Sequence, residues 1–149
     1  MKKKTVDFRN AFFDSFYEIA SKNNEIIFLT ADTDADSLVK FRENHHERFI
    51  NTGVTEQNAV TVASGLALSD KKVFIYSMVP FITMRCYEQI KIDICSMKLP
   101  ITLIGLGTGL SYSYYGPAGH GVIDIAIMRA LPEITIFNPS DPISASAFA

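Results

Sequence analysis

The sequence predicts an α/β protein in which helices cover both faces of a mostly parallel sheet, giving three layers, α/β/α. Short apolar runs without polar alternation are typical of strands that are buried on both faces. Longer segments with helical spacing separate these runs, and the loops after the predicted strands are long and polar. The apolar runs are residues 26–30, 49–50, 72–76, 101–106 and 134–137.

The first two long helices differ in the residues that they carry. Residues 5–21 predict an amphipathic helix with an aromatic face, and residues 40–47 form a polar segment that we expect to be exposed. Residues 56–69 carry alanine and glycine on several faces, so neighbouring backbones can approach closely. We expect this helix to be buried in the domain or at a subunit contact. The apolar residues at helical spacing are Phe8, Phe12, Phe16 and Ile19, with Phe13 and Tyr17 beside them.

The second half of the chain continues the alternation. A helix over residues 81–97 ends at Leu99-Pro100, because the residue before a proline disfavours helical geometry. Residues 107–120, rich in glycine and tyrosine, are too long for a simple connector. A helix over residues 122–130 and a last helical start complete the chain, whose abrupt end suggests a fragment or a truncated subunit. One apolar row of the 81–97 helix is Ile82, Cys86, Ile90 and Ile94.

Composition limits the function. A chain of 149 residues fits one domain, residues 1–149. With 14 Lys and Arg against 16 Asp and Glu, the net charge of −2 does not indicate nucleic acid or an anionic membrane as partner. No apolar run reaches the roughly 20 residues that span a bilayer, and the start lacks the apolar core of a signal peptide. We therefore predict no membrane partner and a cytoplasmic location.

Cysteine and histidine placement gives no metal site. Cys86 and Cys95 are nine residues apart on one predicted helix, which places them on opposite faces and prevents a bond between them. They are most simply buried small hydrophobic residues. The adjacent His45 and His46 lie on a polar segment and are expected to be solvated, so no metal held by this chain alone is predicted.

Glu56 is the first candidate for chemistry. Thr55 is a plausible N-cap, so Glu56 lies in the first helical turn, where the helix dipole favours a negative charge. A structural first-turn glutamate is the alternative. Asp32, Asp34 and Asp36 alternate just after the first strand, where open α/β sheets bind ligands; turn and capping roles are the alternative for the last two.

Several stretches together resemble the pyrimidine-binding domain of the thiamine-diphosphate enzymes of the transketolase family, most of all the C-terminal subunit of split transketolases. Residues 48–58 read RFINTGVTEQN, similar to the family's glutamate-bearing segment. Residues 81–91, FITMRCYEQIK, resemble its next helix. Residues 124–132, DIAIMRALP, and residues 138–141, NPSD, resemble the segments that follow. The correspondence covers nearly the whole chain in the expected order.

The resemblance implies roles for five residues. Glu56 would contact the aminopyrimidine and share a proton with its ring nitrogen, which suits a buried glutamate. Phe81 would stack on the pyrimidine, and the family's other stacking aromatic falls at Met78, which covers a ring with less area. Asp32 matches an acidic residue after the first strand. Arg85 is a weaker candidate for binding the cofactor, and an ion pair on the helix surface explains this residue equally well.

Two departures from the family pattern matter. The family loop with an aspartate and a substrate-facing histidine reads YGPAGH over residues 115–120, so Tyr115 replaces the aspartate and His120 is one place late. His120 can still serve as a catalytic proton-transfer group; a plain loop histidine is the alternative. The Gly-Asp-Gly motif, which in this family holds the diphosphate through a divalent metal, is missing. The resemblance implies that a partner supplies it.

The resulting prediction is half of a two-component, thiamine-diphosphate-dependent transferase that moves a ketol unit between sugar phosphates. Mg²⁺ would be held mainly by the diphosphate-binding subunit or domain, and the isolated chain would be inactive. A C-terminal transketolase domain usually follows in the family. Alternatives are a relative that acts like deoxyxylulose-phosphate synthase or decarboxylates ketoacids, and a non-catalytic assembly module. The small-residue helix suggests a homodimer or a heterotetramer.

Overall fold

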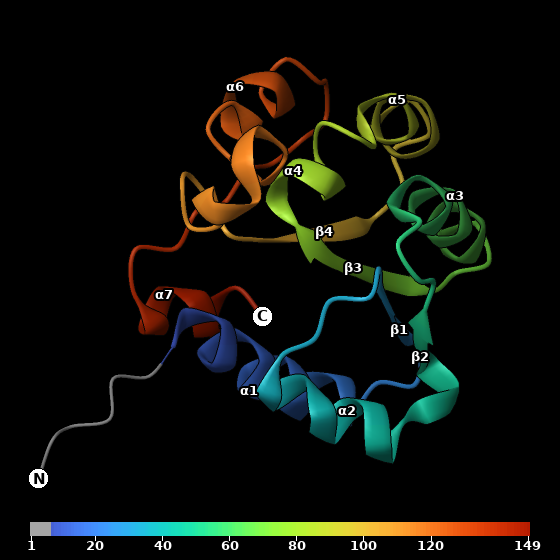
Figure 1. Cartoon of the computed structure of the whole chain (residues 1–149). Coiled ribbons are helices and arrows are strands. Elements are labelled where there is room, and N and C mark those ends of the chain that lie inside the picture. Colours follow the sequence, from blue (N-terminus) through green and yellow to red (C-terminus); the bar gives the residue numbers. More distant parts are fainter. Residues whose placement is uncertain (1–6) are drawn as a thin grey trace, which may run out of the picture.

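A computed structural model describes residues 7–149 of the chain. Four parallel strands form one sheet in the order β2-β1-β3-β4. The strands are β1 (Ile26–Thr30), β2 (Phe49–Asn51), β3 (Lys72–Met78) and β4 (Ile101–Leu106). Helices lie on both faces of the sheet (Figure 1), which confirms the predicted three-layer α/β fold.

The strand order creates a switch point between β1 and β3. The chain leaves β1 for β2 through α2 (Val39–Asn44), then returns past β1 to β3 through α3 (Glu56–Ala67) on the other face. Connections that depart to opposite faces leave a crevice at the carboxyl ends of the two central strands, where open α/β sheets bind ligands. Residues 31–33 and 77–81 lie at this crevice.

An aromatic layer packs on one face of the sheet. Helix α1 (Phe8–Ala20) begins after Asp7, whose carboxylate accepts a hydrogen bond from the Arg9 amide at 2.9 Å. Its buried face contains Phe13 and Phe16, whereas Phe8 and Ile19 are exposed, so only part of the predicted broad aromatic face is buried. Phe16 packs against the rings of three other segments. These pairs are T-shaped or tilted, which are geometries that aromatic rings favour. These rings are Phe28, Phe41 and Phe74.

The polar segment 40–47 is only partly exposed, contrary to expectation. It contains most of α2, which places the Phe41 side chain fully inside the aromatic layer. The following 3₁₀ turn η2 (His46–Arg48) buries Arg48. The Arg48 guanidinium donates hydrogen bonds to three backbone carbonyls between α1 and β1, at 2.8 to 3.4 Å. A buried cation therefore ties these segments together.

The opposite face of the sheet is covered by α3 and by the segment after β3. Helix α3 buries Ala59, Ala63 and Ala67, spaced four residues apart, against the sheet, so the small side chains bring the helix close to it. Val62 and Leu68 remain exposed, and a Cβ atom on Gly65 would meet no neighbour. The expectation of a buried helix holds for one side, and the other side is open.

The helix predicted over residues 81–97 is broken. It consists of α4 (Val79–Ile82), a turn, α5 (Tyr87–Gln89) and the π-helix η3 (Ile90–Cys95). The predicted apolar row is nevertheless buried, from Ile82 to Ile94. Because the wider π-turn changes the helical phase, Cys95 joins Cys86 in the same core instead of facing away from it. Both thiols are free.

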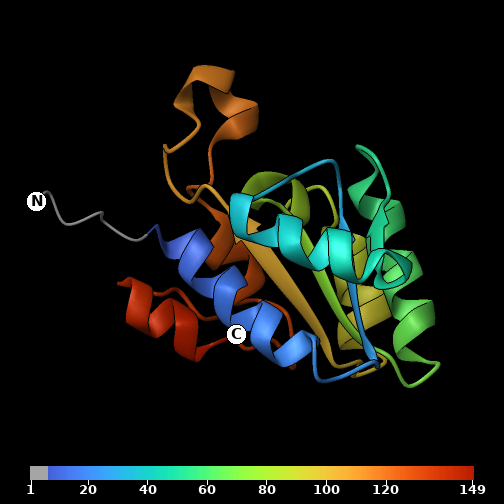
Figure 2. The same ribbon diagram turned by 90° about the horizontal axis from the view of Figure 1, so that it is seen from below.

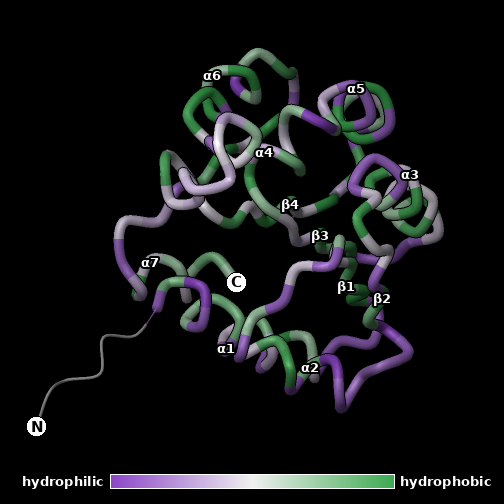
Figure 3. Tube along the Cα trace, in the orientation of Figure 1, coloured by the Kyte–Doolittle hydropathy of each residue, from purple (hydrophilic) through white to green (hydrophobic). Residues whose placement is uncertain are grey.

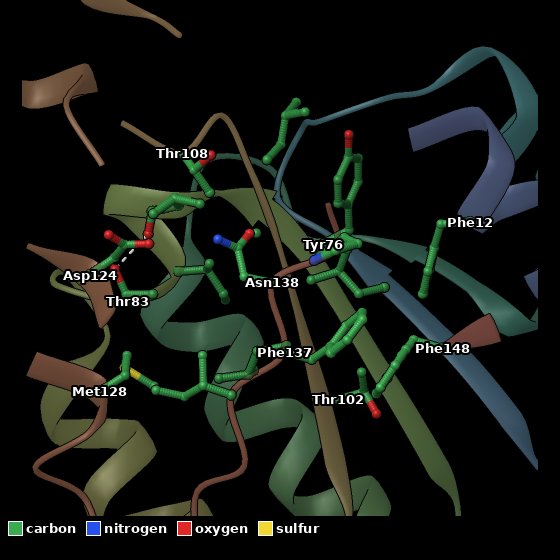
Figure 4. Close-up of a pocket in the computed structure, with 18 of the residues that line it drawn as sticks. Phe12, Tyr76, Thr83, Thr102, Thr108, Asp124, Met128, Phe137, Asn138 and Phe148 are labelled. Atoms are coloured by element: carbon green, nitrogen blue, oxygen red, sulfur yellow. Dashed lines mark hydrogen bonds between the residues drawn. The ribbon is translucent and has the colours of Figure 1, made fainter. Parts of the chain in front are cut away.

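The strand predicted over residues 134–137 does not form. Residues 132–139 run without regular structure between α6 (Asp124–Met128) and α7 (Pro142–Ala147), and β4 has no second partner strand among residues 7–149. Figure 3 shows that the strands are largely hydrophobic, and the outer edge of β4 is unpaired within residues 7–149. A cavity of about 1240 Å³ lies beside this edge. In Figure 4 the rings of Phe137 and Phe148 face each other at one end of it, and Thr83 and Asp124 lie at the other.

No helix within residues 7–149 is both long and apolar enough to cross a membrane.

Candidate functional site

The loops after β1 and β2 are joined by the side chain of Asn51. Its amide oxygen accepts hydrogen bonds from the backbone of Asp32 at 3.1 Å and of Gly53 at 2.9 Å, and its Nδ2 donates to the Asp32 carboxylate at 3.3 Å. Gly53 has a φ of 69°, a conformation that glycine adopts without strain. This turn directs the chain from the sheet edge into α3.

Glu56 is the first residue of α3, as predicted, and its side chain is buried at 2% exposure. Thr55 occupies the N-cap position, but its hydroxyl donates to the carbonyl of Thr52 at 2.7 Å instead of capping the helix. The Glu56 carboxylate faces the end of β3, where the buried Ser77 hydroxyl donates to Oε1 at 3.2 Å. A carboxylate is therefore held next to the switch point by both the helix start and the strand end.

Arg85 is the second partner of the Glu56 carboxylate. Its Nη1 lies 2.6 Å from Oε2, while its Cζ lies 4.0 Å from the centroid of the Phe81 ring. Glu56 and Arg85 also line a cavity of about 330 Å³ together with the start of α3. The structure thus brings together three of the predicted site residues, Glu56, Phe81 and Arg85.

Cys86 lies beside this cluster. Burial raises the pKa of its thiol to about 12; the Glu56 charge adds to this rise and the Arg85 charge opposes it. The thiol points to the carbonyl of Phe81 at 3.1 Å. Cys86 therefore remains protonated at neutral pH and fills the core behind the site.

The other predicted residues make no hydrogen bond or ion pair with this cluster among residues 7–149. Met78 ends β3 and is half-buried, three residues before Phe81. Asp32 is exposed and bonded to Asn51. Asp34 forms a surface ion pair with Arg42 and caps the Ala35 amide, which fits the turn role considered for it. Asp36 opens the 3₁₀ turn η1 (Asp36–Leu38) and is exposed. No group of carboxylate, histidine and cysteine side chains within residues 7–149 is placed to hold a metal ion.

His120 lies at the end of a projecting loop. The ring of Tyr112 covers Gly107, where φ is 80° and a Cβ atom would come within 2.2 Å of the ring. Tyr114 and Tyr115 pack together at the exposed tip, with ring centroids 4.4 Å apart. In Figures 1 and 2 this loop stands on the other side of α4 from α3. The structure does not bring His120 into the Glu56 cluster.

The chain matches the family "Transketolase, pyrimidine binding domain" over residues 4–148. It belongs to this family. The predicted resemblance is therefore confirmed, including its likeness to split transketolases. A solved structure described as "Split gene transketolase, inactive beta4 tetramer" has 30% sequence identity and a TM-score of 0.84, covering 97% of this chain and 46% of that one.

Two curated relatives illustrate the range of the family. An apulose-4-phosphate transketolase subunit of Phocaeicola vulgatus is 31% identical over 95% of this chain and 46% of its own length. A 1-deoxy-D-xylulose-5-phosphate synthase of Nitratidesulfovibrio vulgaris is 33% identical over 90% of this chain and 21% of its own length. The chain thus spans about half of the first relative and about a fifth of the second.

Transketolase of Pichia stipitis, in a complex with sedoheptulose 7-phosphate, shares the fold with a TM-score of 0.82 at 21% identity. The match covers 98% of this chain and 23% of that one.

Sequence reasoning missed two residues of this pyrimidine-binding domain site. Ser77 orients the Glu56 carboxylate, and Asn51 joins the two loops beside it. Both lie at or next to the last residue of a predicted strand. Their position could have identified them, because polar residues at the carboxyl ends of strands face the crevice of an open sheet.

Proposed function

We propose that this chain is the pyrimidine-binding part of a thiamine-diphosphate-dependent, transketolase-like enzyme that transfers a ketol unit between sugar phosphates. The observation that carries the proposal is the buried Glu56 carboxylate, placed at the switch point beside the Phe81 ring. A buried acceptor next to an aromatic face is the environment that an aminopyrimidine needs. Family membership and the split relatives support the same assignment.

The site fits the pyrimidine end of the cofactor. Thiamine diphosphate supplies a nucleophilic carbon and an electron sink for making and breaking carbon–carbon bonds. Glu56 would hold or move a proton at its carboxylate oxygens, and Ser77 fixes the carboxylate by donating to Oε1. Phe81 offers a ring face, and Met78 and Asp32 remain proposed contacts at the ends of β3 and β1. Burial by α3 excludes water from Glu56.

The diphosphate end has no comparable site on this chain. No Gly-Asp-Gly motif is present, and a diphosphate without a cation or a basic cradle binds poorly. We therefore propose that a partner subunit or domain holds the diphosphate with Mg²⁺ and that the isolated chain is inactive. The inactive β4 tetramer named for the split relative supports this view.

Reconstitution tests the proposal. The chain, a diphosphate-binding partner, thiamine diphosphate and Mg²⁺ are mixed with xylulose 5-phosphate and ribose 5-phosphate. We expect activity only in the full mixture, and Glu56→Gln should lower kcat by at least about 100-fold, the range for a proton-transfer group. Glu18→Gln, on the exposed side of α1, is the matched control. Equal rates for both variants would overturn the role of Glu56.

The donor separates two enzymatic functions. The identity to a deoxyxylulose-phosphate synthase favours pyruvate with glyceraldehyde 3-phosphate as a second substrate pair. Release of CO₂ from pyruvate, with no ketol transfer, would support that function instead. If calorimetry with the partner shows no cofactor binding, the chain is an assembly module. His120→Asn should lower kcat/KM for the preferred donor if this loop histidine faces the substrate.

Assembly is a separate proposal. Val62 and Gly65 on α3 and Leu68 at its C-terminal end are exposed, and the small Gly65 allows the close approach of another helix. We propose a homodimer, or a heterotetramer with the partner, and a cytoplasmic location. Light scattering that finds only monomers, alone and with the partner, would contradict this assembly.

A further inference from the structure

The guanidinium of Arg85 occupies both parts of the proposed pyrimidine site, the Glu56 carboxylate and the face of the Phe81 ring. Arg85 donates to the Glu56 carboxylate through Nη1 at 2.6 Å, and its planar group lies 4.0 Å from the centroid of the Phe81 ring. An edge of the cation thus faces the carboxylate, while its carbon lies over the aromatic ring. Cations placed in this way are attracted by the electron-rich ring face.

A guanidinium and an aminopyrimidine share the relevant chemistry. Both are planar, both can place an N–H donor against a carboxylate, the pyrimidine through a ring nitrogen that shares the proton with it, and both can stack on an aromatic ring. The Arg85 side chain and a pyrimidine cannot use the same carboxylate edge and the same ring face at once. We infer that Arg85 is a built-in competitor for the pyrimidine site and must leave it when the cofactor binds; this inference rests on the proposed function.

Arg85 is placed so that it can leave. Its side chain is 40% exposed, and it lies in the turn between α4 and α5 where the helix is broken. Within residues 7–149 its guanidinium has no hydrogen-bond partner besides Glu56. Arg48 is the contrast, because it is buried and its guanidinium donates to three carbonyls. Release of Arg85 breaks one ion pair and lets the guanidinium be hydrated, and the bound pyrimidine takes its place beside the Glu56 carboxylate.

The competitor also explains how a buried carboxylate is tolerated before the cofactor arrives. An uncompensated charge at a site with 2% exposure is costly, and a positive neighbour offsets part of that cost. The ion pair uses the ionised form of Glu56, whereas the proposed chemistry needs this residue to share a proton. Departure of Arg85 on cofactor binding therefore changes Glu56 from an ion-pair partner to a proton-sharing group.

The test is a titration of the 149-residue chain with 4-amino-5-hydroxymethyl-2-methylpyrimidine, the pyrimidine fragment of thiamine. Nitrogen-15 arginine labelling and NMR follow the Arg85 Nε–H signal, assigned with Arg85→Lys. We expect saturation to move this signal to the position of a solvated arginine. Arg85→Gln should bind the fragment about 10-fold more tightly, because the competing state is removed. Arg42→Gln, at a surface ion pair, should bind it like the wild type.

The outcomes distinguish this inference from the proposed function. If Glu56→Gln abolishes fragment binding while Arg85→Gln binds equally or more weakly, Arg85 is not a competitor and the proposed function stands. If Arg85→Gln does not fold, Arg85→Lys provides the test, since it loses the planar group and should also bind more tightly. If no form binds the fragment, nor thiamine diphosphate with the partner, both the proposed function and this inference fail.

Discussion

The two halves of the molecule differ in how completely their segments are joined to one another. The closed half comprises β2, β1 and β3 with α1, α2 and α3; the open half comprises β4, residues 107–121 and residues 132–140. In the closed half Arg48 and Asn51 bind the backbone where segments meet. In the open half β4 has an edge that no strand of residues 7–149 pairs with, beside a large cavity.

This difference shows which elements fix the side-chain positions in the candidate site. Glu56 is fixed by α3 and by Ser77, two parts of the closed half, whereas His120 stands on a loop of the open half. Side chains on packed elements keep their geometry better than side chains on exposed loops do. The proposed pyrimidine end is therefore built on packed elements of this chain, and the proposed substrate-facing histidine is carried by an exposed loop.

The largest effect is expected from the aromatic layer. Phe16→Ala removes a ring with 1% exposure that packs against the rings of three other segments and should lower the free energy of unfolding by about 3–5 kcal/mol. Phe137→Ala, in the open half at 40% exposure, should cost less than about 1 kcal/mol. Urea unfolding of both variants measures the contrast. Similar losses would show that residues 132–140 pack as firmly as α1.

Arg48 tests the buried connection in the closed half. Arg48→Met keeps the length of the side chain but leaves three carbonyls without their donor, so we expect a loss of about 2–3 kcal/mol. Arg42→Met breaks an exposed ion pair and should stay within about 0.5 kcal/mol of the wild type. Chemical unfolding at neutral pH checks both, and equal effects would contradict a special role for Arg48.

Tyr76 gives the smallest expected effect, at the border between the two halves. Burial raises the pKa of its hydroxyl from 10.0 to about 12, and the nearby Arg9 charge offsets part of this rise. The folded protein then keeps this proton at a pH where the unfolded chain loses it. Stability is therefore fully present below pH 10 and decreases as the pH rises toward 12.

Tyr76→Phe should remove this contribution and flatten the alkaline decrease in stability by about 1 kcal/mol at a pH of about 11. At pH 7 it should not lower the stability, because the buried Tyr76 hydroxyl has no hydrogen-bond partner to lose among residues 7–149. Unfolding curves between a pH of about 8 and about 11 measure this. Parallel curves for the variant and the wild type would show that the Tyr76 environment is open to water.

The sequence by itself determined the alternation of strands and helices, the position of Glu56 in the first turn of α3, and the family. These depend on local apolar patterns and on residues that are neighbours along the chain. The 26–30 and 101–106 strands have the predicted bounds. The broken helix after β3 was not predictable, since a π-turn keeps the apolar row buried with a different backbone.

Only the tertiary structure decided which groups meet. Ser77 and Arg85 are 21 and 29 residues from Glu56 in sequence, and nothing local indicates that both would bind its carboxylate. The failure of residues 134–137 to pair with β4 is likewise a tertiary outcome, because a short apolar run forms a strand only where a neighbouring edge is aligned with it. The sequence thus specified the carboxylate, and packing gave it a cationic partner that the cofactor would have to displace.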